Sequence, residues 1–148
     1  SSLNPKHDAK TIMARIMALD YGGKRTGIAT TDPLQIIATP LTTVETKQLL
    51  TFLKDYCDKE EVEAIVIGKP TRHDGSDSAI EKYILEFIQK LKEVLPQLSI
   101  SRINEMYTSK EAMQTLIASG VKKKKRRDKK LLDSTAATLI LQEFLQHR

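Results

Sequence analysis

Short apolar strand patterns alternate with amphipathic helix patterns along most of this 148-residue chain. The runs at residues 15–20 and 26–31 flank a loop with two glycines, which is typical of a β-hairpin. A β-rich stretch follows at residues 35–44, where Pro40 indicates an edge strand or a bulge. Because helices and strands alternate after this opening, the sequence predicts an α/β fold, a mixed sheet with helices on its faces.

The remaining elements are two strands and four helices. The strands are expected at residues 63–68 and 98–103. One helix is expected to begin at Ser78 and Glu81, which have the spacing of a capping box. Its apolar positions repeat at intervals of three and four and predict a buried stripe of Ile80, Tyr83, Ile84, Phe87, Ile88, Leu91 and Val94. The other helices are expected at residues 46–57, 108–119 and 130–146.

Composition excludes several classes of protein. Hydrophobic residues make up 40% of the chain, too many for a disordered protein, yet no apolar run is long enough to span a bilayer. The single cysteine, Cys57, excludes a disulfide framework and fits the reducing cytoplasm, where we expect this protein to act. Residues 1–13 lack periodicity and are expected to be either a disordered tail or residues foreign to the natural chain, so that residues 14–148 form a single domain.

Positive charge is concentrated in one segment, residues 122–130, which reads KKKKRRDKK. The rest of the chain holds 16 basic and 18 acidic residues and is nearly neutral. Such a block attracts a polyanion, so nucleic acid is a natural partner, although a solvated loop without a partner would have the same composition.

Three carboxylates occupy positions where a solvated acid is not expected. Asp20 ends the first strand, and Glu105 follows the strand at 98–103. Asp133 lies on the apolar stripe of the last helix, which continues through Ala136, Ala137, Ile140 and Phe144. A buried carboxylate needs a partner, a proton or a metal ion.

Each acid also has an ordinary interpretation, as a turn cap, a solvated side chain or a residue favoured at a helix N-terminus. Together, however, two acids at strand ends and one at a helix start predict a cluster, because ligands in open α/β sheets collect beyond the carboxyl ends of strands. Oxygen ligands of this kind suit Mg²⁺ or Mn²⁺, and such ions support phosphodiester hydrolysis.

Four segments in this order resemble the YqgF family, the RuvX-type Holliday junction resolvases and pre-16S rRNA nucleases. The segments are ALDYGGKRTGIA, IGKPTRHDGSDS, NEMYTSKEA and LLDSTAATLILQEFL. The resemblance extends over residues 14–145 and is most specific in the first segment. It implies an RNase H-like fold, with a mixed five-stranded sheet flanked by helices, and an acidic metal site.

The resemblance assigns the acids of that site residue by residue. Asp20, Glu105 and Asp133 correspond to the family's acids and are the expected catalytic residues and ligands of Mg²⁺ or Mn²⁺. The chain departs from the family's Asp-Glu-Arg pattern, since Asn104 and Met106 flank the glutamate. Asn104 lacks the charge of the family's aspartate, and Met106 lacks the phosphate-binding cation of the family's arginine. These two departures are expected to affect the binding of substrate more than the binding of metal.

The function expected from these features is a metal-dependent endonuclease that processes the 5′ end of pre-16S ribosomal RNA. A resolvase of four-way DNA junctions, or a nucleic-acid-binding protein of this fold without catalysis, remain alternatives. A symmetric resolvase would be a homodimer, whereas an RNA-trimming enzyme need not be. The expected nucleic-acid contacts are Lys24, Arg25, Arg72, Lys122, Lys123, Lys124, Lys125, Arg126, Arg127, Lys129 and Lys130.

Overall fold

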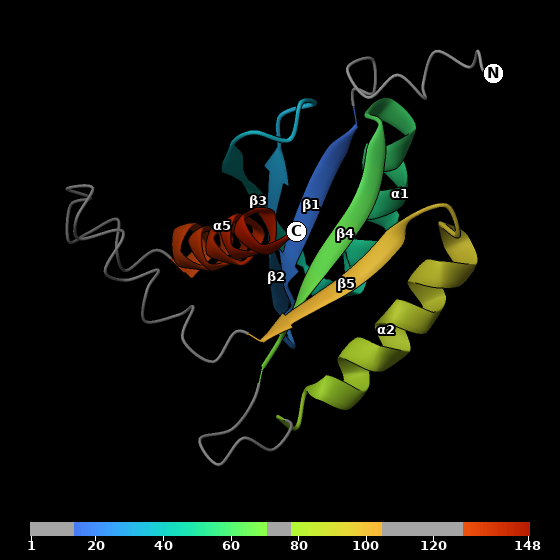
Figure 1. Cartoon of the computed structure of the whole chain (residues 1–148). Helices are drawn as coiled ribbons and strands as arrows, with labels where there is room; N and C mark the ends of the chain where they lie inside the picture. The colour runs from blue at the N-terminus through green and yellow to red at the C-terminus, as the bar shows by residue number, and fades with distance from the viewer. Residues whose placement is uncertain (1–13, 71–77, 105–128) are drawn as a thin grey trace.

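The computed structural model of this chain describes residues 14–70, 78–104 and 129–148, and of residues 129–133 it describes only the backbone. A mixed five-stranded sheet in the order β3-β2-β1-β4-β5 forms its centre (Figure 1). β1 pairs antiparallel with β2, as β2 does with β3, whereas β4 runs parallel to both β1 and β5. The strands are β1 (Arg15–Asp20), β2 (Arg25–Thr31), β3 (Ala38–Glu45), β4 (Val62–Lys69) and β5 (Ser99–Asn104).

Helices cover both faces of this sheet. α1 (Leu49–Lys59) and α2 (Glu81–Val94) lie on one face, and α5 (Lys129–His147) crosses the other (Figure 1). A short 3₁₀ turn, η3 (Thr46–Gln48), leads from β3 into α1. The expected mixed five-stranded sheet flanked by helices is therefore confirmed.

The central strand β1 is apolar on both of its sides because both faces of the sheet are covered. Met17 and Leu19 belong to the core that packs against α1 and α2. Ile16 and Ala18 belong to a second core, where Ile140 of α5 is fully buried. Since side chains alternate along a strand, this division fixes which way each later residue of β1 faces.

Most of the expected elements are confirmed within one or two residues of their bounds. Pro40 lies on the edge strand β3 and beside an irregularity in its pairing with β2, so both interpretations of this proline were correct. The expected helix at 108–119 lies outside the described residues. In the described ranges, no helix is long and apolar enough to cross a membrane.

The predicted strand at 35–44 began too early. Residues 33–37 form a loop in which the Asp32 carboxylate accepts hydrogen bonds from the amides of Leu34, Ile36 and Ile37. These hydrogen bonds, led by that of Ile37, lower the pKa of Asp32. Gln35 adopts a φ of 61°, which a strand does not contain, so the aspartate closes the loop before β3 begins.

The predicted capping box at the start of α2 was wrong. The residue before the helix is Ile80, which makes no side-chain cap, and the Ser78 hydroxyl accepts a hydrogen bond of 3.5 Å from the Ile80 amide. Instead, Glu81 is buried and receives two hydrogen bonds of 2.8 Å from the guanidinium of Arg102 on β5. An ion pair with a distant residue has replaced the local hydrogen bond that the spacing indicated.

The predicted apolar stripe of α2 was correct for four residues, Ile84, Phe87, Ile88 and Leu91, all of which are buried. It was wrong for two others. Tyr83 is 52% exposed and Val94 is 37% exposed, so α2 presents an aromatic side chain to solvent.

Candidate functional site

The C-terminal end of β1 is the point around which the candidate site is built. Asp20 is the last residue of β1 and pairs with Gly27 of β2, which in turn pairs with Thr43 of β3. The Thr43 hydroxyl lies 2.9 Å from the hydroxyl of Ser134 on α5. Neighbouring residues therefore connect Asp20, across β2 and β3, with Ser134, the residue that follows Asp133. We call this connection the row from Asp20 to Ser134.

The sheet face on which Asp20 lies is set by the alternation of β1. Asp20 follows Ile16 and Ala18 at intervals of two, and these residues pack against α5. Asp20 is half-buried, on the same side of the sheet as α5. Asp133 lies in the first turns of α5, where the backbone is described and the side chain is not.

The strands on the other side of β1 end at the same edge of the sheet. Leu19 pairs with Ile67 of β4, which pairs with Arg102 of β5, so Asp20 lies one residue beyond this row and Asn104 two residues beyond it. Asn104 is exposed at the end of β5. Glu105, the next residue, lies outside the described residues.

The loop that joins β1 to β2 is held by the turn η3. The Thr46 hydroxyl donates a hydrogen bond of 2.6 Å to the Gly22 carbonyl, and the Thr46 amide donates one of 2.8 Å to the Lys24 carbonyl. The Thr26 hydroxyl completes this network at 2.9 Å from that of Thr46. A Cβ on Gly22 would lie 2.3 Å from the Arg25 carbonyl oxygen, so the tight turn requires glycine at this position.

We expect Thr46→Val to destabilise the protein by about 1–3 kcal/mol, because it removes hydrogen bonds to the Gly22 carbonyl and to the buried Thr26 hydroxyl while keeping the side-chain volume. Thr46→Ser keeps the hydroxyl and serves as the control. Urea unfolding measures the difference. Equal stability of the two variants would show that the turn does not depend on this hydroxyl.

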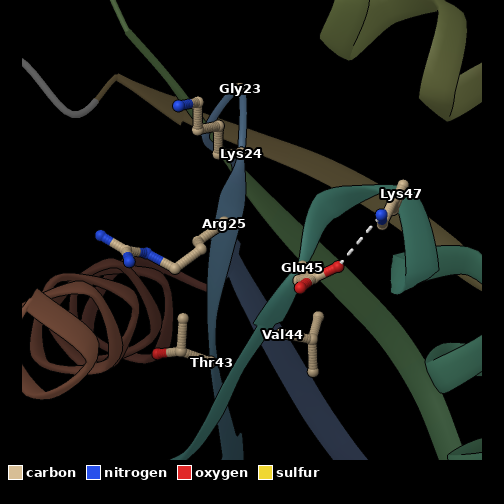
Figure 2. A pocket seen from close by; sticks show the side chains of 7 residues that line it. All are labelled: Gly23, Lys24, Arg25, Thr43, Val44, Glu45 and Lys47. Carbon is tan, nitrogen blue, oxygen red and sulfur yellow. Dashed lines mark ion pairs between the residues drawn. The ribbon is translucent and has the colours of Figure 1, made fainter.

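A cavity of about 570 Å³ opens beside this loop. Figure 2 shows Arg25 and Thr43 pointing towards the side of α5, while Lys47 approaches Glu45 at 3.5 Å. The cavity is lined by Gly23, Lys24, Arg25, Thr43, Val44, Glu45 and Lys47. We call it the front cavity. Three cations against one carboxylate make it suited to a phosphate group.

Lys24 and Arg25, which the sequence predicted as phosphate contacts because they lie close to Asp20, both line this cavity. The sequence did not identify Thr43, Glu45 or Lys47, which come from β3 and η3. Their only signal was indirect: β3 pairs with β2 and thereby carries these residues to the loop. A threonine near the end of β3 and a lysine in a short 3₁₀ turn carry no local pattern that separates them from ordinary surface residues.

Several predicted site residues lie outside the described residues: Glu105, Arg72, and the basic residues Lys122, Lys123, Lys124, Lys125, Arg126 and Arg127. Lys129 and Lys130 begin α5, with only their backbone described. In the described part of the chain, no group of three or more His, Cys, Asp or Glu side chains is arranged to hold a metal ion. Of the three predicted ligands, only the side chain of Asp20 belongs to that part.

Comparison with known proteins gives one family. A model of the RuvX family, described as "Holliday junction resolvase", matches residues 14–147. A protein of Christiangramia forsetii named "Putative pre-16S rRNA nuclease" is 50% identical over 133 residues, or 90% of this chain and 98% of that protein. A protein of the same name from Flavobacterium psychrophilum is 47% identical over 136 residues, or 92% and 99% of the two chains. The solved structure of YeaZ from Pseudomonas aeruginosa matches 73% of this chain and 50% of its own, at 18% identity and a TM-score of 0.43.

Proposed function

Because this chain belongs to the RuvX family, we propose that it is a divalent-metal-dependent endonuclease that processes the 5′ end of pre-16S ribosomal RNA. The observation that carries the proposal is the match, over nearly the full length of both chains, to relatives named "Putative pre-16S rRNA nuclease". The substrate follows from those relatives, and the chemistry from the residues around Asp20.

The edge of the sheet beyond β1 supports a site for phosphodiester hydrolysis. Asp20 is half-buried on the side of the sheet that α5 covers, and the front cavity opens two strands away at Thr43. An acid and a group of cations at one edge can hold a metal ion and a phosphate together. The cations would bind the sugar–phosphate backbone of the nucleic acid and would not recognise its sequence.

The donor set fits Mg²⁺ or Mn²⁺, since carboxylate oxygens are the ligands that these ions prefer. We propose that Asp20, Glu105 and Asp133 hold the ion. The row from Asp20 through Gly27 and Thr43 to Ser134 supports the inclusion of Asp133, because it brings the first turns of α5 to the same edge. A bound ion would supply Lewis acidity and a water of lowered pKa.

The residues of the loop have separate tasks in this proposal. Arg25 binds a phosphate through two of its N–H groups, and Lys24 adds an exposed positive charge next to it. Thr46 keeps the loop against η3, so that both cations stay at a constant distance from Asp20. The basic residues 122–130 add affinity that falls as the salt concentration rises.

The test is cleavage of a pre-16S RNA fragment by the purified protein, with Mg²⁺, with Mn²⁺ or with a chelator. We expect cleavage with either metal, none with the chelator, and a loss of at least about 100-fold in Asp20→Asn and Asp133→Asn, because each removes a charged ligand. Asp58→Asn, an exposed position on α1, is the matched control and should cleave at the wild-type rate.

A four-way DNA junction in the same assay separates the proposed substrate from its alternative. Cleavage of the junction and not of the RNA would make the protein a resolvase. Binding of RNA without cleavage under any metal would leave a nucleic-acid-binding protein. Metal-dependent cleavage that survives in Asp20→Asn would contradict the proposed site while leaving the substrate correct.

A further inference from the structure

A second cavity, of about 370 Å³, is lined by residues of the β1–β2 loop, η3, α1 and α2. We call it the rear cavity. Its walls include the aromatic side chains of Tyr21 and Phe87, which belong to the core under α1 and α2, and that of Tyr83. Lys47, Lys90 and Glu86 supply its charged groups.

The two cavities meet at the end of the sheet. Gly23 and Lys47 line both of them. Asp20 faces the side of α5, and the next residue, Tyr21, packs on the opposite side, since consecutive residues of a strand point to opposite faces. A nucleic-acid strand that runs along the front cavity and passes Gly23 would therefore enter the rear cavity. Gly23 has nothing within 4 Å of a Cβ position, so the crossing point is open.

Tyr83 is the feature of the rear cavity that the fold does not explain. It lies on the predicted apolar stripe of α2, yet it is 52% exposed. The Lys82 ammonium lies 5.1 Å from the centre of its ring, so a cation accompanies the aromatic surface. Exposed aromatic rings with lysines beside them are what proteins use to stack the bases of a single strand.

The polar groups of the rear cavity complement a nucleobase. Glu86 provides carboxylate oxygens that accept hydrogen bonds from the amino groups of a base. Burial, and then the charge of Glu86, raise the pKa of Tyr21, so its hydroxyl stays protonated and can donate. Lys47 and Lys90 bring positive charge for the phosphates on either side of that base.

We propose that the rear cavity binds one unpaired base of an RNA strand whose backbone lies in the front cavity, with the base stacked on Tyr83. The inference rests on the proposed function, since it needs a nucleic-acid strand at the β1–β2 loop. Its consequence is a preference for RNA with an unpaired segment beside the cleavage site, because a paired base cannot leave the helix without loss of stacking.

The test measures binding of a fluorescent single-stranded RNA of about 12 nucleotides, a length that a single-strand site typically covers, in the presence of a chelator so that no cleavage occurs. Tyr83→Ala is expected to weaken binding about tenfold, which lies within the 1–3 kcal/mol that a stacked base contributes. Leu85→Ala, 50% exposed on the same helix but outside the cavity, is the matched control and should bind as the wild type does. Duplex RNA of the same sequence should bind equally to all three proteins.

A second measurement does not depend on any variant. Amide NMR signals of the wild-type protein are followed as adenosine monophosphate is added, and those of Tyr21, Gly23 and Tyr83 are expected to shift together. Equal binding of single-stranded RNA by Tyr83→Ala and wild type, or the absence of these shifts, would overturn the rear cavity as a base site. If Lys24→Ala weakens RNA binding while Tyr83→Ala does not, the proposed function stands and only this inference fails; if the wild type binds no RNA, both fail.

Discussion

A Gly22→Ala variant is expected to lose about 3 kcal/mol of unfolding free energy, the upper part of the range for a side chain forced into a filled space. The added Cβ would lie 2.3 Å from the carbonyl oxygen of Arg25. That oxygen belongs to the backbone at the start of β2, so it cannot move aside as a flexible side chain would. The β1–β2 loop must change shape instead.

The same substitution is expected to lower cleavage by at least about 100-fold, because misplacing catalytic or binding groups by about 1 Å has effects of this size. Lys24 and Arg25 follow Gly22 within three positions, and the Thr46 hydroxyl donates a hydrogen bond to the Gly22 carbonyl itself. A change at Gly22 is thus expected to displace Lys24 and Arg25 in the front cavity and to disturb the hydrogen bond between Thr46 of η3 and the Gly22 carbonyl.

The neighbouring glycine provides the control for this experiment. A Cβ on Gly23 meets nothing within 4 Å, so Gly23→Ala should change stability by less than about 0.5 kcal/mol. Urea unfolding is run on both variants, and the RNA cleavage assay compares Gly22→Ala with the wild type. If Gly22→Ala were as stable as Gly23→Ala and as active as the wild type, the close approach of Gly22 to Arg25 would not be a feature of the folded protein.

Glu81→Gln is expected to cost about 3–5 kcal/mol of stability, as the loss of one partner from a buried ion pair usually does. The Glu81 side chain is 7% exposed and accepts two hydrogen bonds of 2.8 Å from the Arg102 guanidinium. Arg102 also donates to the carbonyls of Ile67 and Gly68, at 3.1 Å each. An amide in place of the carboxylate would leave the positive charge of Arg102 uncompensated in this setting.

The Arg15–Glu60 pair offers a matched comparison at a different burial. Its closest atoms are 3.0 Å apart, but the Glu60 side chain is 41% exposed, so water screens the charges. Glu60→Gln should therefore cost less than about 1 kcal/mol. The denaturation midpoints of Glu81→Gln and Glu60→Gln measure the two losses of stability. Similar losses in both variants would mean that burial does not set the strength of the Arg102–Glu81 pair.

The Arg102–Glu81 pair also affects the candidate site. Arg102 fixes the end of β4 through Ile67 and Gly68, and Glu81 fixes the start of α2 to the same point. The edge of the sheet beyond Asp20 is thus held on one side by Thr46 and on the other by Arg102. Neither residue needs to touch the substrate, and both keep the residues that do in a constant arrangement.

Local patterns in the sequence were sufficient to predict the elements of the fold. Apolar runs predicted β1 and β4, and intervals of three and four predicted the buried face of α5 through Ala136, Ala137 and Ile140. Asp20 was predicted to end β1, and it does. These successes share a cause: burial of one face imposes a period on the sequence, and that period can be read without knowing what lies opposite.

Partners far apart in the chain were not predictable in this way. Glu81 meets Arg102, 21 positions away, instead of its capping partner, and Thr43 meets Ser134 across 91 positions. The front cavity acquires Lys47, and the rear cavity brings Tyr83 together with Tyr21. Local patterns thus predicted most of the buried strand and helix faces and the point where each strand ends, although they missed the exposure of Tyr83 and the burial of Glu81. Which residues meet depends on the fold as a whole, because strand register and helix docking are set by the packing of the entire core and leave no local period in the sequence.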